Sequence, residues 1–182
     1  MMKSNKLLIV ITIAVSSYFF TGCFGVDAKF YKIKKSVMNH IPESYYTDVE
    51  LGIGSVGLSL AKIAIKFNND HDVREARKVL SEITKVQVGV YKQNGSDKIK
   101  NIRTFLNEVA SDLYNEGWVN IVKNIDRDEM TSIYLRPNAG NEIRELLVIN
   151  FERDELVIAN VEGNFSQALA SVIGSGKMHI EM

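Results

Sequence analysis

Residues 141–163, NEIRELLVINFERDELVIANVEG, decide the fold of this chain. They read as two strands, because apolar residues alternate along the first half and residues 156–161 form a second, almost wholly apolar run. The apolar positions on one face of the first strand are Ile143, Leu147, Ile149 and Phe151. The charged stretch at residues 152–155 suits a tight hairpin connection. Two strands are marginally stable alone in water, so the rest of the chain must supply further strands and covering helices.

The composition is that of an ordinary globular protein, with 182 residues of which 46% are hydrophobic and 24% are charged. This length predicts one domain. The 22 basic and 22 acidic residues give a formal net charge of zero, which excludes an overall field that would attract nucleic acid. A single cysteine excludes an intramolecular disulfide, so the fold must be held together by packing.

The first residues have the order of a secretory signal. Two lysines, Lys3 and Lys6, precede an uncharged run at residues 7–20, and the small residues that follow end at Cys23. The apolar run is shorter than the roughly 20 residues that a transmembrane helix needs. Residues 1–22 are therefore predicted to be a signal that is removed from the mature protein.

The step from Gly22 to Cys23 resembles the end of a bacterial lipoprotein signal, whose cysteine becomes the lipid-bearing first residue after cleavage. The resemblance implies that acyl chains on Cys23 hold the protein at a membrane of the cell envelope. Phe24 follows the cysteine where the pattern for inner-membrane retention has Asp, which implies the outer membrane and its periplasmic side. The alternative is an uncleaved anchor helix in which Cys23 is unmodified.

Residues 23–47 are predicted to form the lipidated N-terminus and a basic amphipathic tether. The apolar positions at helical spacing are Phe30, Ile33, Val37 and Ile41, and the basic positions beside them are Lys29, Lys32, Lys34 and Lys35. Such a helix can lie on anionic lipid through its lysines. The alternative is a first helix that docks on the domain with its lysines in solvent, and this interpretation is favoured.

Residues 52–57 spell GIGSVG, the G-x-G-x-x-G pattern of dinucleotide-binding loops. The strand candidate before them, residues 49–51, is short and mixed in character, and no second βαβ half follows. We therefore interpret the glycines as a strand-to-helix connection and predict no nucleotide cofactor. The run Asp70-His71-Asp72 is interpreted as a helix start, because three consecutive residues rarely converge on one metal ion.

An α+β domain is predicted over residues 48–173, followed by a loose tail at residues 174–182. The predicted elements are a strand at 49–51, helices at 56–68 and from Asp72, a strand at 86–91, a helix from Asp97 to Gly117, strands at 118–125, 130–136, 143–151 and 156–161, and a short helix at 166–173. This order favours helices packed on one face of a mostly antiparallel sheet that ends in a four-strand meander. The hairpin at residues 143–161 is expected at or beside the centre of the sheet.

The segments SVGLSLAKIAI (55–65), KVQVGVYK (85–92), GWVNIVK (117–123) and SIYLRPNAGNEIRELLVINFERDELVIANVEG (132–163) carry a family resemblance. They are similar to a bacterial family catalogued as a domain of unknown function, number 4252, whose members are small exported proteins and often lipoproteins. The resemblance covers about residues 48–170 and includes no catalytic motif. It implies an envelope protein without assigned activity.

No catalytic site, metal site or cofactor is predicted. The three histidines, His40, His71 and His179, fall in the tether, at a helix start and in the tail, where no rigid strand end would hold them for catalysis. The carboxylate pairs of the chain lie in predicted turns, where solvated charge is the usual explanation. The chain is therefore predicted to be no enzyme.

Two functions remain open. The first is a membrane-tethered, non-enzymatic interaction or envelope-maintenance module, whose sheet meets an envelope protein through Trp118, Tyr134 and Arg136. A core position is an equal alternative for Trp118. The second is a periplasmic carrier of a small apolar or lipid-like ligand between helices and sheet, which requires an apolar cavity of several hundred Å³.

Overall fold

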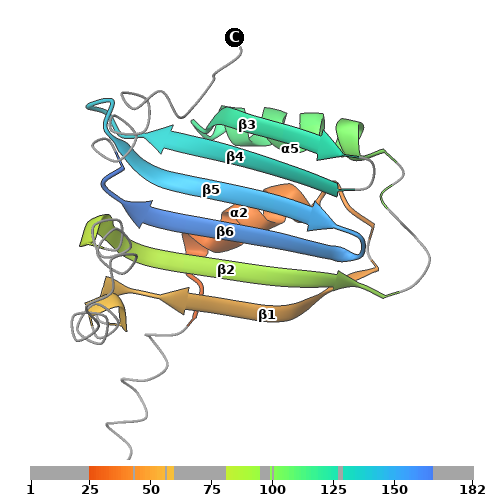
Figure 1. Cartoon of the computed structure of the whole chain (residues 1–182), viewed down its shortest axis with the longest axis horizontal. Helices are drawn as coiled ribbons and strands as arrows, with labels where there is room; N and C mark the ends of the chain where they lie inside the picture. Colours follow the sequence, from red (N-terminus) through yellow and green to blue (C-terminus); the bar gives the residue numbers. More distant parts are fainter. Residues whose placement is uncertain are drawn as a thin grey trace, which may run out of the picture.

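The computed structural model describes residues 25–42, 44–55, 57–59, 81–94, 99, 101–126 and 129–165. These residues form a six-stranded antiparallel sheet with helices across one face (Figure 1). In chain order the elements are α2 (Ala28–Met38), β1 (Tyr45–Ile53), β2 (Ile83–Gln93), α5 (Ile102–Asn115), β3 (Val119–Asp126), β4 (Glu129–Pro137), β5 (Ile143–Glu152) and β6 (Glu155–Gly163). The fold class is α+β, as the sequence predicts.

The strand order is β1-β2-β6-β5-β4-β3, which places the β5–β6 hairpin in the middle of the sheet. Strands β3 to β6 are neighbours in succession, and β2 and then β1 extend the sheet beyond β6. The hairpin turns over Arg153 and Asp154, because Glu152 and Glu155 are opposite each other. Arg153 adopts a positive φ of 58°, which a two-residue connection commonly requires.

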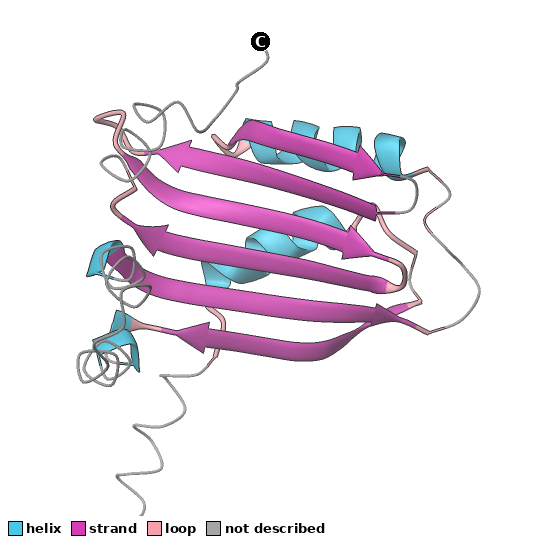
Figure 2. Cartoon of the chain, in the orientation of Figure 1, coloured by secondary structure: helices cyan, strands magenta, loops and turns pink. Residues whose placement is uncertain are grey.

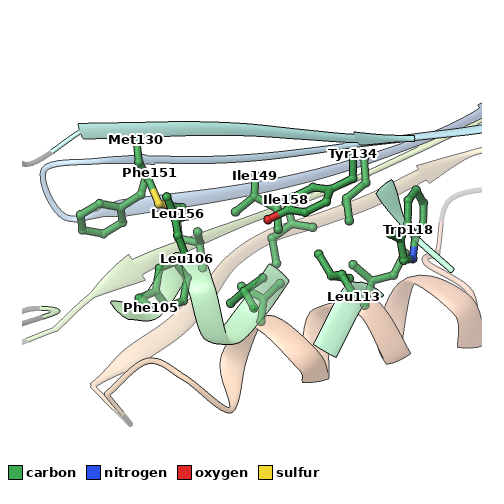
Figure 3. Close-up of a cluster of buried hydrophobic side chains, with 14 of the residues drawn as sticks. Phe105, Leu106, Leu113, Trp118, Met130, Tyr134, Ile149, Phe151, Leu156 and Ile158 are labelled. Atoms are coloured by element: carbon green, nitrogen blue, oxygen red, sulfur yellow. The ribbon is translucent and has the colours of Figure 1, made fainter. Parts of the chain in front are cut away.

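The hydrophobic core lies between the helices and one face of the sheet (Figures 2 and 3). On the central hairpin it contains Leu147, Ile149 and Phe151 of β5 and Leu156 and Ile158 of β6, all at most 4% exposed. These residues alternate along both strands, so the inward positions predicted for β5 at Leu147, Ile149 and Phe151 are confirmed. Phe105, Leu106 and Leu113 of α5 close the core from the other side (Figure 3).

Helix α2 also belongs to this core. Phe30, Ile33 and Val37 are each at most 1% exposed, because their helical spacing places them on the one side of α2 that faces the sheet. The prediction that residues 23–47 form a tether is therefore wrong for α2. The alternative, in which this helix docks on the domain, is confirmed. The packed domain begins no later than Asp27, whose side chain caps α2 by accepting a hydrogen bond from Phe30 N at 2.9 Å.

Helix α5 begins later than the sequence suggests. Its N-cap is Asn101, whose side-chain oxygen accepts a hydrogen bond from Thr104 N at 3.0 Å, so the predicted start at Asp97 is wrong. The reason is that Asn101 directly precedes the apolar stripe of the helix, where a cap residue has its greatest effect. The predicted end is confirmed by Gly117, which has a φ of +85° just past the helix.

Several predicted segments lie outside the described residues: the signal and Cys23, most of the helices at residues 56–68 and from Asp72, the helix at 166–173 and the tail. Among the described residues, no helix is long and apolar enough to cross a membrane.

Candidate interaction surface

The second face of the sheet carries a large aliphatic surface, which we call the open face. Because side chains alternate along each strand, every strand that sends one set of residues to the helices sends the other set here. The pairing of strands arranges the open face in rows that cross the sheet from β1 to β3. Figure 2 shows α2 and α5 behind the sheet, and no described helix lies in front of it.

Three rows define the open face. The first row is Val49, Val90, Val157, Asn150, Thr131 and Asn124. The second row is Leu51, Val88, Ala159, Val148, Ile133 and Val122. The third row is Ile53, Val86, Val161, Leu146, Leu135 and Val119. The second and third rows contain aliphatic side chains alone, on all six strands.

The aliphatic rows are accessible to solvent along much of their length. Val49 and Val119 are each 50% exposed and Leu51 is 39% exposed, while the side chains on the central strands are mostly half-buried. In the first row the polar half is internally bonded, since the Thr131 hydroxyl donates to Asn150 Oδ1 at 2.7 Å. A contiguous apolar surface that extends across six strands is typical of a contact site in soluble proteins.

An acidic row borders the open face at one end. It lies two residues beyond the first row along each strand and consists of Glu155, Glu152, Glu129 and Asp126 on four neighbouring strands. Lys92 continues the row on β2 and pairs with Asp48 at 2.8 Å. The surface therefore changes from aliphatic to acidic along the strand direction.

Both edges of the sheet carry devices that oppose strand addition. Strand β1 is irregular between Thr47 and Val49, and β3 is irregular between Asn120 and Val122. Such bulges twist an edge strand and interrupt its row of hydrogen-bonding groups. The open face is therefore a better candidate for partner contact than either edge.

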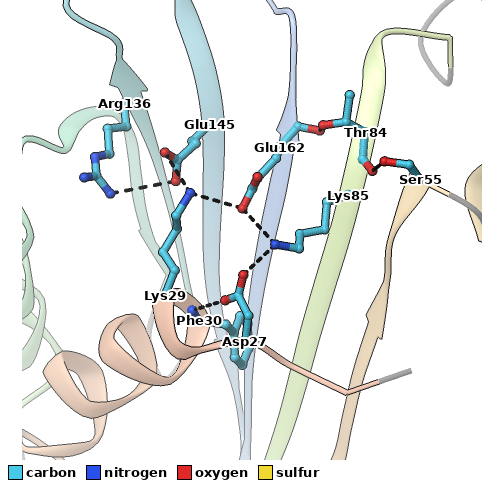
Figure 4. A network of polar contacts seen from close by, with 9 residues as sticks. All are labelled: Asp27, Lys29, Phe30, Ser55, Thr84, Lys85, Arg136, Glu145 and Glu162. Atoms are coloured by element: carbon cyan, nitrogen blue, oxygen red, sulfur yellow. Dashed lines mark hydrogen bonds and ion pairs between the residues drawn. The ribbon is translucent and has the colours of Figure 1, made fainter. Parts of the chain in front are cut away.

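A polar network fastens α2 to the other face of the sheet (Figure 4). It alternates in charge through Asp27, Lys85, Glu162, Lys29, Glu145 and Arg136. Lys29 Nζ lies 3.2 Å from Glu162 Oε1 and 3.3 Å from Glu145 Oε1, so the helix is held to β6 and β5 at once. Lys32 pairs with Glu116 and Lys34 with Glu50, so three of the lysines considered for lipid contact are paired within the domain.

The pKa shifts in this network follow from its pairing. Burial raises the pKa of Asp27, but the hydrogen bonds from Lys85 and from the Phe30 amide outweigh it, and the net pKa is lowered. The hydrogen bond to Asp27 raises the pKa of Lys85 against the opposing effect of burial. Both shifts favour the charged forms, which is the behaviour of a structural ion pair.

Two buried amides lie beside the network. Gln87 is bonded to Asp27 in the orientation in which its amide nitrogen donates to Oδ1 at 3.2 Å and its oxygen accepts from the backbone nitrogen at 2.7 Å. Asn160 is opposite Gln87 and fully buried, and neither atom of its amide has a hydrogen-bond partner among the described residues. An unpaired buried amide costs stability, which makes Asn160 the least favourable position of this layer.

The residues predicted to form an exposed contact are not together on the surface. Trp118 and Tyr134 are each 1% exposed and belong to the core, because β4 directs Tyr134 towards the helices and Trp118 immediately follows the turn that ends α5. Arg136 is half-buried, with its guanidinium 5.6 Å from the centre of the Trp118 ring. A partner therefore cannot reach the two aromatic side chains without opening the core.

Sequence reasoning missed the open face although its signal was present. Residues 156–161 are apolar at every position, which is typical of a strand with apolar side chains on both faces. The predicted strand at residues 86–91 is confirmed, and Val86, Val88 and Val90 lie on one face of it. The structure places these valines on the open face, while Gln87, Gly89 and Tyr91 point to the helices.

The glycine pattern at residues 52–57 has a packing role at its first position. A Cβ on Gly52 would collide with the backbone oxygen of Gly25, so the N-terminal segment approaches β1 too closely for any other residue. Strand β1 ends at Ile53 and helical residues begin at Ser55, which confirms the predicted strand-to-helix connection.

The described histidine is part of the helix packing. His40 Nε2 lies 2.8 Å from Asp112 Oδ2 and thereby joins the end of α2 to α5. Among the described residues, no group of His, Cys, Asp and Glu side chains could hold a metal ion. Asp70-His71-Asp72 lies outside those residues.

Comparison with known proteins gives one family. The model of a family described as "Domain of unknown function (DUF4252)" matches residues 46–170, which is more than half of the chain. No curated protein matches the sequence and no solved structure matches the fold.

Proposed function

The chain belongs to the DUF4252 family, and from this premise we propose that it is a membrane-tethered, non-enzymatic interaction module of the cell envelope. The observation that carries the proposal is the open face. Six strands at about 4.8 Å and three rows at about 7 Å give it an area of roughly 600 Å², of which the aliphatic positions occupy roughly 500 Å², within the range of the largest apolar patch on a typical monomer. An aliphatic face of this size favours a stable contact with another molecule.

The chemistry of the open face favours a protein partner over a lipid surface. A surface that lies on anionic lipid is rich in Lys and Arg at its rim, since each contributes about 1 kcal/mol of attraction. Here the rim carries Glu155, Glu152, Glu129 and Asp126, which an anionic surface would repel. A protein can meet the same acidic row with basic side chains or leave it in solvent.

The lipid anchor on Cys23 supplies the membrane tether in this proposal. Asp27, the cap of α2, is four positions after Cys23, and this length of chain can span at most about 14 Å. The docking of α2 therefore makes the tether short and keeps the domain beside the membrane. The outer membrane and its periplasmic side are the proposed location.

The tether is tested by its cysteine. Cys23→Ser is expected to block lipid attachment and normal processing, whereas a chain starting at Phe24 behind an ordinary cleavable signal is expected in the soluble periplasmic fraction. Fractionation with a high-salt wash, together with mass spectrometry of the mature N-terminus, measures both. A native protein that retains residues 1–22 and an unmodified Cys23 would show that the anchor is a helix and not a lipid.

The contact surface is tested by proximity labelling in the native envelope with two matched variants of the full chain. Leu51→Lys places a charge in the second row at a side chain that is 39% exposed, and Tyr114→Lys places one on α5 at a side chain that is 74% exposed. Leu51→Lys is expected to remove neighbours from the labelled set while Tyr114→Lys leaves it unchanged. Identical sets for both variants would overturn the open face as the contact surface.

A carrier of an apolar ligand was the second function that the sequence left open. The helix–sheet layer is filled by large side chains such as Phe105, Trp118 and Tyr134 (Figure 3). No specific observation favours a carrier, so the proposal rests on the surface.

A further inference from the structure

The open face has the shape to pack against its own copy. We infer that a second copy of this chain covers it, so that two sheets stack face to face in a homodimer. This inference rests on the proposed function, because it names the partner of the same surface. Four features of the molecule support it: the similar size of the side chains in the rows, the area of the rows, the position of the acidic row and the position of the anchor.

The side chains of the open face project to similar heights from the sheet. Of the twelve side chains in its second and third rows, six are valine, and the rest are leucine, isoleucine and one alanine, Ala159. Side chains of similar length on a pleated sheet form the layer that packs at about 10 Å against another sheet, with strand directions within about 30°. No aromatic ring projects from these two rows, so a flat apolar partner fits better than a pocketed one.

The area suits a dimer. Two copies of a face of roughly 600 Å² bury about 1,200 Å² in total, the lower end of the range for specific interfaces. Interfaces between identical chains are also more apolar than other interfaces, as the second and third rows are. Because a two-fold interface uses the same patch on both copies, an uncharged and uniform surface is complementary to itself.

The acidic row sets the orientation. If the two-fold axis ran along the strands between β5 and β6, Glu152 would lie about 10 Å from Glu155 of the second copy, and the acidic rows would face each other with like charges that salt only partly screens. If the axis instead crosses the strands along the second row, all three rows are covered and the two acidic rows lie roughly 30 Å apart at opposite ends. The first row of one copy then covers the third row of the other, and Val148 lies over Val148 of the second copy.

The anchor is compatible with this orientation. The segment that follows Cys23 reaches the sheet at β1, where Gly25 contacts Gly52. Strand β1 is one edge of the sheet, and an axis that crosses the strands runs from this edge to β3. When the β1 edges of both copies face the membrane, the axis is perpendicular to the membrane and both lipid anchors reach the same surface.

Site-directed cross-linking of the full chain in membranes tests the dimer. The wild-type chain contains one cysteine, Cys23, and provides the baseline. Val148→Cys, near the axis, is expected to form a dimer with a thiol cross-linker of about 10 Å reach, which equals the separation of stacked sheets. Glu152→Cys, in the acidic row on β5, and Tyr114→Cys, on α5, are expected to give only the baseline signal.

A charge placed on the open face should disrupt the dimer. Val119→Lys, at a side chain that is 50% exposed and so tolerates charge in the monomer, is expected to reduce the Val148→Cys dimer at least about tenfold. Tyr114→Lys in the same background is the control and is expected to leave the dimer unchanged. Thermal melting of each variant verifies that it is folded.

Each other result contradicts the inference in a distinguishable way. A dimer through Glu152→Cys shows a two-fold axis along the strands and overturns the proposed orientation. A Val148→Cys adduct with a different protein overturns the second copy but leaves the interaction module standing. A Val148→Cys chain that forms no adduct of any kind overturns both proposals.

Discussion

The two faces of this sheet are built from the same strands by different rules. On the helix-covered face the side chains differ in size and polarity from row to row, from Met130, Phe151, Leu156 and Tyr91 at one end to Arg136, Glu145, Glu162 and Lys85 at the other. On the open face two complete rows hold aliphatic side chains of similar size. The first pattern locks two helices in one position, whereas the second makes a flat layer.

The two faces also differ in where their polar side chains lie. The helix-covered face buries Gln87 and Asn160 and ends in a network of ion pairs. The open face confines its polar residues to half of the first row and to the acidic row beyond it. We therefore expect the helix-covered face to determine stability and the open face to determine association.

The largest expected contrast compares neighbouring residues of β5. Leu147→Ala and Ile149→Ala should each lower the free energy of unfolding by roughly 2 to 5 kcal/mol, because they leave cavities in the core. Val148→Ala and Arg144→Ala should each lower it by less than about 1 kcal/mol in dilute monomer, since neither side chain is in the core. Urea unfolding of the soluble chain measures all four. Equal losses would show that the open face is a second core.

A second contrast compares two glycines. The ring of Tyr91 lies over Gly89, and its hydroxyl donates to Glu50 Oε1 at 2.9 Å. A Cβ on Gly89 would lie 2.6 Å from Tyr91 Cζ, so Gly89→Ala must displace the ring and should cost about 1 to 3 kcal/mol. Gly54→Ala, which meets nothing within 4 Å, is the control and should leave the melting temperature nearly unchanged. If Gly89→Ala melts like the control, the ring is not held there.

A third contrast concerns Asn160, the unpaired amide of the helix-covered face. Asn160→Leu removes a buried polar group that has no described partner and should raise the free energy of unfolding by about 1 kcal/mol. Val161→Leu, the adjacent position on the open face, is the control and should change stability little. A loss of stability in Asn160→Leu would mean that the amide is bonded and has a role in the layer.

The smallest effect is the pH dependence of the network under α2. The pKa of Asp27 is below its ordinary value of 3.8 in the folded chain, so its contribution is complete above about pH 4 and is lost as the pH falls through the folded value. Partial exposure limits this contribution to less than about 1 kcal/mol. Asp27→Asn should therefore flatten the decline in stability below pH 4. An unchanged dependence of stability on acid pH would show that the ion pair with Lys85 does not stabilise the fold.

The fold was predictable where local pattern and tertiary packing agree. The alternation of Leu147, Ile149 and Phe151 gave the correct inward face, and Gly117 gave the correct end of α5. The start of α5 was not predictable, because Asp97 and Asn101 are both good cap residues and only the packing of the helix selects Asn101.

The candidate site was less predictable, because residue type alone does not tell which way a strand faces. Trp118 and Tyr134 are residue types common at interfaces, but both are needed to fill the core beneath α5. The valines of the open face are ordinary core residues by type. Their importance depends on the register of six strands, which places them in continuous rows, and register is a tertiary property.

The central claim is that the open face contacts another molecule while the helix-covered face holds the fold. A photoreactive side chain at Val148 of the full chain, irradiated in native membranes, tests this most directly, with the same group at Tyr114 as the control. An adduct larger than the single chain is expected at position 148 and none at position 114. Reaction of position 148 with residues of its own chain alone would contradict it, because the open face would then be an interior surface of the monomer.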